Sequence, residues 1–362
     1  MLFTPLQIAG MTLAHRVTVA PMCQYSAVDG CMTDWHLVHL GTLAVSGAAM
    51  LVIEATGVTP EGRITPQCVG LYSDANEAAM ARVVKYVRGV SDIRLGVQLG
   101  HAGRKASAER PWEGRGALLP EAGGWVTEAP SALALAPGWP TPRAMTADDL
   151  HRVKQAFAAA ARRAVRLGLD FIELHCTHGY LLSEFLSPLA NRRDDDYGGS
   201  LDARMRYPLE VFDAVKAAVP ARYPIGAKIS GTDFASGGWM PDDAVAFARA
   251  LKERGCAYVT VSGGGVVLDA KVPVGPGYQV PYAERVKRET GIVTGAVGLI
   301  TEPQQAEAIV AEGRADFVSL ARGMLYDPRW PAHAAHALGA TVKYPPQYER
   351  AAPGVWPGAA KR

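Results

Sequence analysis

The sequence has few cysteines, and they are too scattered to form a recognisable cross-linking or cluster-binding pattern. Its 362 residues include five cysteines, and no two of them form a C-x-x-C pair. This scatter excludes the framework of a disulfide-rich secreted domain and gives no sign of an iron–sulfur cluster. The five are Cys23, Cys31, Cys68, Cys176 and Cys256.

The sequence also lacks a charge imbalance and a long apolar run. Its 37 basic and 35 acidic residues give a formal charge of +2. We therefore expect neither nucleic acid nor an anionic membrane as a partner. No apolar run approaches the roughly 18 residues that suggest a membrane span. The first residues, Met1 to Pro5, lack the basic start and apolar stretch of a secretory signal. These absences predict a soluble protein in the reducing cytoplasm.

No G-x-G-x-x-G follows the first predicted strand, which disfavours a doubly wound nucleotide-binding sheet but leaves it as the alternative fold. What recurs instead is a helical stretch, a glycine and a short apolar strand, with Gly168, Gly255 and Gly313 at the helix ends. Most predicted strands are continuous apolar runs, as expected when both faces of a sheet are covered. The predicted strands are Val17–Ala20, Met50–Glu54, Leu95–Leu99, Phe171–Leu174, Ile225–Ile229, Tyr258–Val261, Ile292–Thr294 and Phe317–Leu320.

Repeated strand–helix units of this kind predict an α/β protein with a closed parallel (β/α)8 barrel formed by one domain, residues 1–362. Helix starts are marked by Thr146 with Asp149 three residues later, by Ser200, and by Thr301 with Pro303.

A long insertion follows the third predicted strand. It spans 44 residues, 102–145, and is rich in proline and tryptophan. Loops of this length are usually functional or poorly ordered. The tryptophans favour a packed capping loop over the barrel mouth, and a surface excursion without a catalytic role is the alternative.

The fourth predicted strand ends in three side chains that can donate protons, His175, His178 and Tyr180. The carboxyl ends of barrel strands face the catalytic mouth. The histidines could be core or rim residues, could bind a metal as in a metal-dependent hydrolase, or could donate hydrogen bonds to a substrate oxygen. The metal interpretation lacks a third ligand, because we expect strand alternation to point Glu173 away from His175. A barrel that only binds a ligand is a further alternative.

Other strand ends supply candidate cofactor contacts. Cys23 follows the first strand, Gln98 offers a donor and an acceptor, and a buried Lys228 would require an anionic partner. The seventh and eighth strands lead into glycine-bearing turns, where barrels usually hold a phosphate. Ordinary turn glycines are the alternative.

Taken together, these motifs resemble the Old Yellow Enzyme ene-reductases, most closely the bacterial thermophilic-like or xenobiotic-reductase-like subclass. The resemblance covers nearly the whole chain, so that each motif is supported by the others. The matching segments are Leu2–Pro5, Pro21–Tyr25, Val97–Lys105, His175–Leu182, Tyr197–Ser200, Gly295–Thr301 and Pro346–Arg350.

The resemblance implies a TIM barrel with noncovalently bound FMN at its mouth. Gln98 would bond the pyrimidine edge of the flavin, and Lys228 would face N1 and the C2 carbonyl. The residues that would line the flavin are Ala20, Pro21, Met22, Cys23 and Ala55, and those that would hold the phosphate are Gly298, Ala321 and Arg322.

The resemblance also implies a reaction. NADPH or NADH would deliver a hydride to flavin N5 and leave, and an α,β-unsaturated carbonyl compound would then bind the same site. His175 and His178 would hold the carbonyl oxygen, and Tyr180 would supply the Cα proton. Tyr25 would contact the substrate, and Arg350 would reach a neighbouring subunit's site, which implies a homodimer or dimer of dimers built on the tail, 340–362.

Three features depart from the family pattern. Lys228 stands where relatives usually have arginine and lacks the planar fork of a guanidinium. Ala321 replaces a common glycine, and the tail continues past Arg350.

Overall fold

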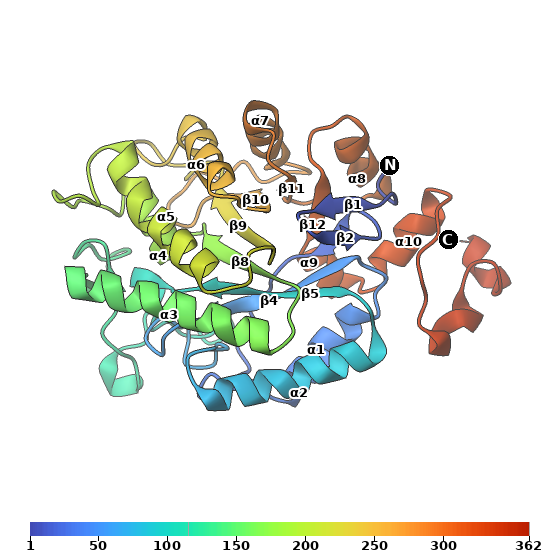
Figure 1. The fold of residues 1–362 in the computed structure, drawn as a ribbon, viewed down its shortest axis with the longest axis horizontal. Helices are drawn as coiled ribbons and strands as arrows, with labels where there is room; N and C mark the ends of the chain where they lie inside the picture. The colour runs from blue at the N-terminus through green and yellow to red at the C-terminus, as the bar shows by residue number, and fades with distance from the viewer. Residues whose placement is uncertain (115, 362) are drawn as a thin grey trace.

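The chain folds around a closed barrel of parallel strands. The computed structural model describes residues 1–114 and 116–361. Each barrel strand pairs with the next one along the chain, and β12 pairs with β3 to close the circle (Figure 1). The strands are β3 (Val17–Val19), β4 (Met50–Gly57), β5 (Arg94–Gly100), β8 (Phe171–Cys176), β9 (Ile225–Ser230), β10 (Tyr258–Ser262), β11 (Thr294–Ala296) and β12 (Phe317–Leu320).

Helices connect the strands and surround the barrel (Figure 1). They are α1 (Asp34–Ala44), α2 (Asp74–Val90), α3 (Ala147–Arg166), α4 (Leu181–Leu186), α5 (Leu201–Ala217), α6 (Pro241–Glu253), α7 (Val280–Thr290), α8 (Pro303–Ala311), α9 (Arg322–Tyr326) and α10 (Trp330–Ala337). Among the described residues, no helix is long and apolar enough to cross a membrane. The predicted α/β barrel is therefore confirmed.

Three aromatic rings fill the N-terminal end of the barrel, because glycines on neighbouring strands leave room for them. Phe171, Tyr258 and Phe317 are fully buried. Their register partners are Gly96, Gly226 and Gly295, where an added Cβ would collide with the ring of the paired aromatic residue. Burial of each ring contributes about 1.5–3 kcal/mol.

A small hairpin seals the N-terminal end of the barrel. Strands β1 (Leu6–Ile8) and β2 (Met11–Leu13) pair antiparallel and pack against the three aromatic rings in one apolar cluster. With this end closed, the C-terminal ends of the strands form the open mouth. No pattern in the sequence predicted this hairpin.

The boundaries of three predicted strands were wrong by two or more residues. Strand β4 continues to Gly57 instead of ending at Glu54. Strand β8 continues through His175 and Cys176 instead of ending at Leu174, so His175 belongs to the strand. Strand β11 begins at Thr294, where the prediction for residues 292–294 ended. Apolar runs locate a strand, but its ends depend on pairing with neighbouring strands.

The predicted helix signals were largely correct. Thr146 and Asp149 form a reciprocal capping box at α3, and the Ser200 hydroxyl accepts from the backbone of Ala203 at α5. Thr301 was wrong as a cap, because Glu302 occupies the cap position of α8. The three predicted helix-ending glycines all have positive φ, between 70° and 85°, for Gly168, Gly255 and Gly313.

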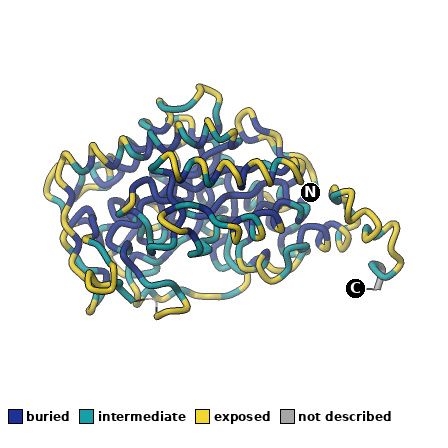
Figure 2. The backbone as a smooth tube through the Cα atoms, turned by 90° about the horizontal axis from the view of Figure 1, so that it is seen from below, coloured by how far each residue is buried: buried dark blue, intermediate teal, exposed yellow. Residues whose placement is uncertain are grey.

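The insertion after β5 contains short elements of its own. They are the 3₁₀ turns η1 (Gly103–Lys105) and η2 (Pro120–Ala122) and the paired strands β6 (Glu128–Ala129) and β7 (Arg143–Ala144). The C-terminal tail forms η3 (Pro346–Ala351) and η4 (Pro357–Lys361) and extends from the body with most residues exposed (Figure 2). Residues 115 and 362, in the predicted loop and tail, lie outside the described residues.

Candidate active site

The structure brings His175, His178 and Tyr180 together at the barrel mouth. The ring centroids of His175 and His178 lie 5.3 Å apart, and those of His175 and Tyr180 lie 4.8 Å apart. Both ring pairs meet edge to face. Nδ1 of His175 is buried without a hydrogen-bond partner in the described part of the chain. An unpaired polar atom of this kind is costly unless a ligand satisfies it.

The site keeps all three groups uncharged at neutral pH. Burial lowers the pKa of His175 and of His178 well below the usual value, and Lys228 and Lys105 lower both further. Burial also raises the pKa of Tyr180 well above its usual value. The imidazoles are therefore neutral hydrogen-bond donors, and the phenol retains its proton.

A chain of hydrogen bonds reaches one ring nitrogen of His178. The side-chain amide of Gln279 donates to Oγ of Ser262 at 3.3 Å. Oγ of Ser262 lies 2.8 Å from Nε2 of His178. Because Ser262 accepts from an amide, its own hydrogen can point to Nε2, an arrangement that would leave the imidazole proton on Nδ1. Neither Ser262 nor Gln279 was predicted as a site residue.

Two residues at the mouth adopt the left-handed backbone conformation that favours glycine. His178 has φ of 64° and Tyr25 has φ of 51°. Such conformations cost about 1–3 kcal/mol and persist where the surroundings enforce them. Tyr25 also meets Trp112 of the insertion edge to face, with ring centroids 5.8 Å apart. The insertion therefore contacts a residue of the mouth.

The floor of the site contains the carboxyl group of Glu173, which was predicted to point away from His175. Residues two apart on a strand share a face, so Glu173 and His175 both point into the barrel. The side-chain amide of Gln98 donates to Glu173 at 2.8 Å, and the Thr260 hydroxyl donates at 3.3 Å. The charge of Glu173 also raises the pKa of buried Lys228 against the lowering effect of burial. Burial raises the pKa of Glu173 itself, and the charge of Lys228 lowers it. Glu173 is thus the carboxyl group that neighbours Lys228, and correct alternation would have found it.

A second buried carboxylic acid supports the segment that carries Cys23. Oε1 of Glu54 accepts the backbone N–H of Gln24 at 3.1 Å, and Oε2 lies 3.7 Å from Nε2 of His36. Burial raises the pKa of Glu54 to about 8. Burial, Cys68 and Glu54 together raise the pKa of the Cys23 thiol well above its usual value. Cys23 is therefore a neutral thiol at physiological pH.

The two predicted phosphate-binding turns lie side by side, because β11 and β12 are paired parallel strands. Gly298 has φ of 106°, a conformation strained for any residue with a side chain. Ala321 has an unusual backbone conformation, with φ −110° and ψ −92°, directly before α9. Arg322 is exposed beside it. Two irregular turns and a nearby guanidinium suit an anionic group.

The other predicted flavin contacts also lie at strand ends. Ala20 is buried directly after β3, and the segment from Pro21 to Cys23 follows with partial exposure. Ala55 lies within β4 and lines a small cavity shared with His175 and Tyr180. Arg350, in contrast, is exposed on η3 of the tail.

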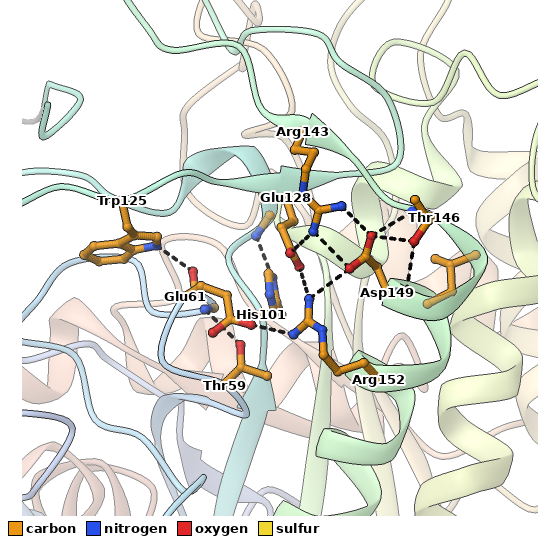
Figure 3. A network of polar contacts seen from close by, with 12 residues as sticks. Thr59, Glu61, His101, Trp125, Glu128, Arg143, Thr146, Asp149 and Arg152 are labelled. Atoms are coloured by element: carbon orange, nitrogen blue, oxygen red, sulfur yellow. Dashed lines mark hydrogen bonds and ion pairs between the residues drawn. The ribbon is translucent and has the colours of Figure 1, made fainter. Parts of the chain in front are cut away.

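One cluster of described residues has ligand atoms close enough to hold a metal, and it excludes His175 and His178. Glu61, His101 and Glu128 place one such atom each within 4.8 Å of one another. Both carboxylates are already paired with a cation, because Arg152 binds Glu61 at 2.5 Å and Glu128 at 2.6 Å (Figure 3).

Further contacts extend this network. Nδ1 of His101 accepts the backbone N–H of Gly103 at 3.1 Å, which leaves the ring proton on Nε2. Arg143 pairs with Glu128 and with Asp149 of α3 (Figure 3). The cluster is an ion-pair network that joins the insertion to α3.

Comparison with known proteins places this geometry in a family. Residues 1–340 match the NADH:flavin oxidoreductase / NADH oxidase family. The chain belongs to this family. It is 42% identical to an NADPH dehydrogenase of Geobacillus thermodenitrificans over 351 residues, covering 96% of this chain and 98% of that protein. Recognition as an Old Yellow Enzyme-type, FMN- and nicotinamide-dependent flavin oxidoreductase is confirmed.

Solved structures agree with the family assignment. Morphinone reductase is 28% identical, with a TM-score of 0.76 and coverage of 96% of this chain and 92% of that one. A 2-naphthoyl-CoA reductase shares the fold with a TM-score of 0.85 at 22% identity. The structural match covers 94% of this chain and 52% of that longer enzyme.

Proposed function

We propose that this flavin oxidoreductase is an ene-reductase that reduces the activated C=C bond of α,β-unsaturated carbonyl compounds with NADPH or NADH. The observation that carries the proposal is the grouping of two neutral imidazoles and one protonated phenol at the mouth. Neutral donors can hold a carbonyl oxygen, and a phenol can supply a proton.

The protein side chains act at two positions of the substrate, the carbonyl oxygen and Cα. His175 and His178 donate to the carbonyl oxygen and stabilise the negative charge that develops there. For His178 the donor is Nδ1, because Ser262 occupies Nε2. Tyr180 releases its proton to Cα, and Tyr25 contacts the substrate.

The cofactor-binding residues fit FMN. Gln98 and Lys228 would hold the pyrimidine edge, Cys23 and Ala55 would contact the ring, and the turns at Gly298, Ala321 and Arg322 would hold the phosphate. FMN, when bound and reduced by a nicotinamide nucleotide, supplies the hydride that reaches the substrate Cβ. The buried unpaired Nδ1 of His175 and the positive φ of Gly298 support this assignment.

The test replaces each histidine separately. His175→Ala and His178→Ala should each reduce kcat/KM for 2-cyclohexen-1-one by about 100-fold, since one oxyanion donor is worth about 3 kcal/mol. Flavin absorbance should be retained in both variants. Normal turnover in both variants would remove the assigned role. Dialysis against EDTA, which would abolish a metal-dependent hydrolase, should leave turnover unchanged.

We also propose the capping role of the insertion and a dimer contact through the tail, 340–362. The Tyr25–Trp112 ring contact supports the first. The exposed, extended tail supports the second (Figure 2). Removal of the residues after Tyr344 should convert the oligomer to monomers in gel filtration, and a persisting dimer argues against the tail. Arg350→Ala should raise KM without changing assembly if this arginine reaches a partner's site. The cytoplasmic location stays a prediction.

A further inference from the structure

Lys105 occupies a position at the mouth to which the reaction above assigns no role. Its ammonium donates to the carbonyl oxygen of His178 at 2.7 Å and to that of Gly265 at 3.0 Å. The same ammonium lies over the ring of Tyr180, 4.9 Å from the centroid. One cation therefore contacts the backbone of a proposed carbonyl-binding residue and the ring of the proposed proton donor.

The two carbonyl groups belong to neighbouring turns, which can approach each other closely only because Gly179 and Gly265 lack side chains. Gly179 has φ of 71° and Gly265 has φ of 86°, and an added Cβ on either would collide with the other turn. Lys105 bridges this contact. Because His178 itself has a positive φ, the bridge helps to hold a strained backbone in place.

Several charged groups surround Lys105. Glu184 of α4 accepts the backbone N–H of Arg104 at 2.9 Å, and its charge raises the pKa of Lys105, whereas Arg104 lowers it. Burial is the largest effect and lowers the pKa of Lys105 to about 8. Glu184 is itself buried, with a pKa raised to about 8. His175, His178 and Tyr180 complete the surroundings and are uncharged at neutral pH.

We propose that Lys105 is a positioning residue for alkene reduction, which holds the His178 turn in its strained conformation and stabilises the phenolate that Tyr180 becomes after giving its proton to Cα. The proton leaves the Tyr180 hydroxyl, a C–H bond forms at Cα, and the negative charge left on the phenol ring faces the ammonium. A proton from solvent then restores the phenol. This inference rests on the proposed function.

The test compares three replacements with different capabilities. Lys105→Met removes the charge and both hydrogen bonds. Lys105→Gln keeps a hydrogen-bond donor without the charge, and Lys105→Arg keeps a donor and the charge. Each holoenzyme is checked for FMN absorbance and thermal unfolding. Reduction of 2-cyclohexen-1-one is then compared with reoxidation by oxygen, which requires no proton at an alkene carbon. Affinity for p-hydroxybenzaldehyde, measured by flavin absorbance, reports the position of His178 independently of turnover.

Lys105→Met should lower kcat for the alkene about tenfold, a fraction of a general acid's full contribution, and weaken p-hydroxybenzaldehyde binding. Lys105→Gln should recover binding but not kcat, and Lys105→Arg should recover both. Wild-type turnover should fall as pH rises through about 8, where the ammonium loses its charge. This decline should shift to higher pH in Lys105→Arg and persist in Glu184→Gln.

Alkene turnover within twofold of wild type in both uncharged variants, with the alkaline decline retained, would overturn the inference. A decline that disappears in Glu184→Gln would also overturn it, because the titrating group would then be Glu184. Failure of the proposed function looks different. In that case the FMN-loaded wild type itself does not reduce 2-cyclohexen-1-one.

Discussion

Replacement of Ser262 by alanine tests whether the orientation of the His178 proton matters to turnover. Ser262 links Gln279 to Nε2 of His178 through contacts of 3.3 and 2.8 Å. Without the hydroxyl, nothing in this chain of contacts holds the proton on Nδ1, and the imidazole can adopt the tautomer that presents no donor to the substrate. His178 itself stays in place, since its backbone carbonyl is held by Lys105.

The expected magnitude follows from one buried hydrogen bond. Its net value is about 1 kcal/mol, with a spread of about 0.5. At about 1.4 kcal/mol per tenfold, the loss in kcat/KM is roughly three- to tenfold. This is well below the roughly 100-fold expected for His178→Ala, because the ring remains and half of its orientations still donate.

Ser230→Ala is a matched control. Ser230 is the register partner of Ser262 on the adjacent strand, is similarly buried, and bonds Thr177 at 2.8 Å instead of a histidine. The assay is anaerobic reduction of 2-cyclohexen-1-one, with thermal unfolding to measure stability. Both variants should lose similar stability, and only Ser262→Ala should lose turnover. Equal turnover in the two variants would refute the tautomer argument.

Three further predictions concern stability and the insertion. Glu54 has a folded pKa of about 8, above its unfolded value, so the folded state binds an extra proton between about pH 4.5 and 8. The free energy of unfolding of the wild type should therefore fall as pH rises through that range. In urea unfolding, Glu54→Gln should lose this part of the pH dependence, and an unchanged slope would contradict the prediction. Gly226→Ala drives a methyl group into the Tyr258 ring and should cost more than about 2 kcal/mol or prevent folding, whereas Gly89→Ala, in open space within α2, should stabilise by up to about 1 kcal/mol in the same measurement. Arg152→Ala removes a shared partner of two carboxylates and should accelerate limited proteolysis within residues 102–145, an effect that Arg192→Ala should not produce.

The sequence by itself determined the barrel and the content of its mouth. Apolar runs, helix-ending glycines and capping hydroxyls are local signals, because each depends on the conformation of a few neighbouring residues. They located every barrel strand and the starts of α3 and α5. The positions of His175, His178 and Tyr180 at the end of one strand also followed from the chain order, because all strands of a parallel barrel present the same end to the mouth.

Only the tertiary structure decided how these groups are oriented and charged. The contacts of Lys105 with Gly265, of Ser262 with His178, and of Glu173 with Thr260 each join residues more than 80 positions apart. No local pattern encodes such distances. The protonation states depend on burial, which is a property of the closed barrel and not of any segment, and so the neutral imidazoles and the protonated phenol emerge only when the strands come together.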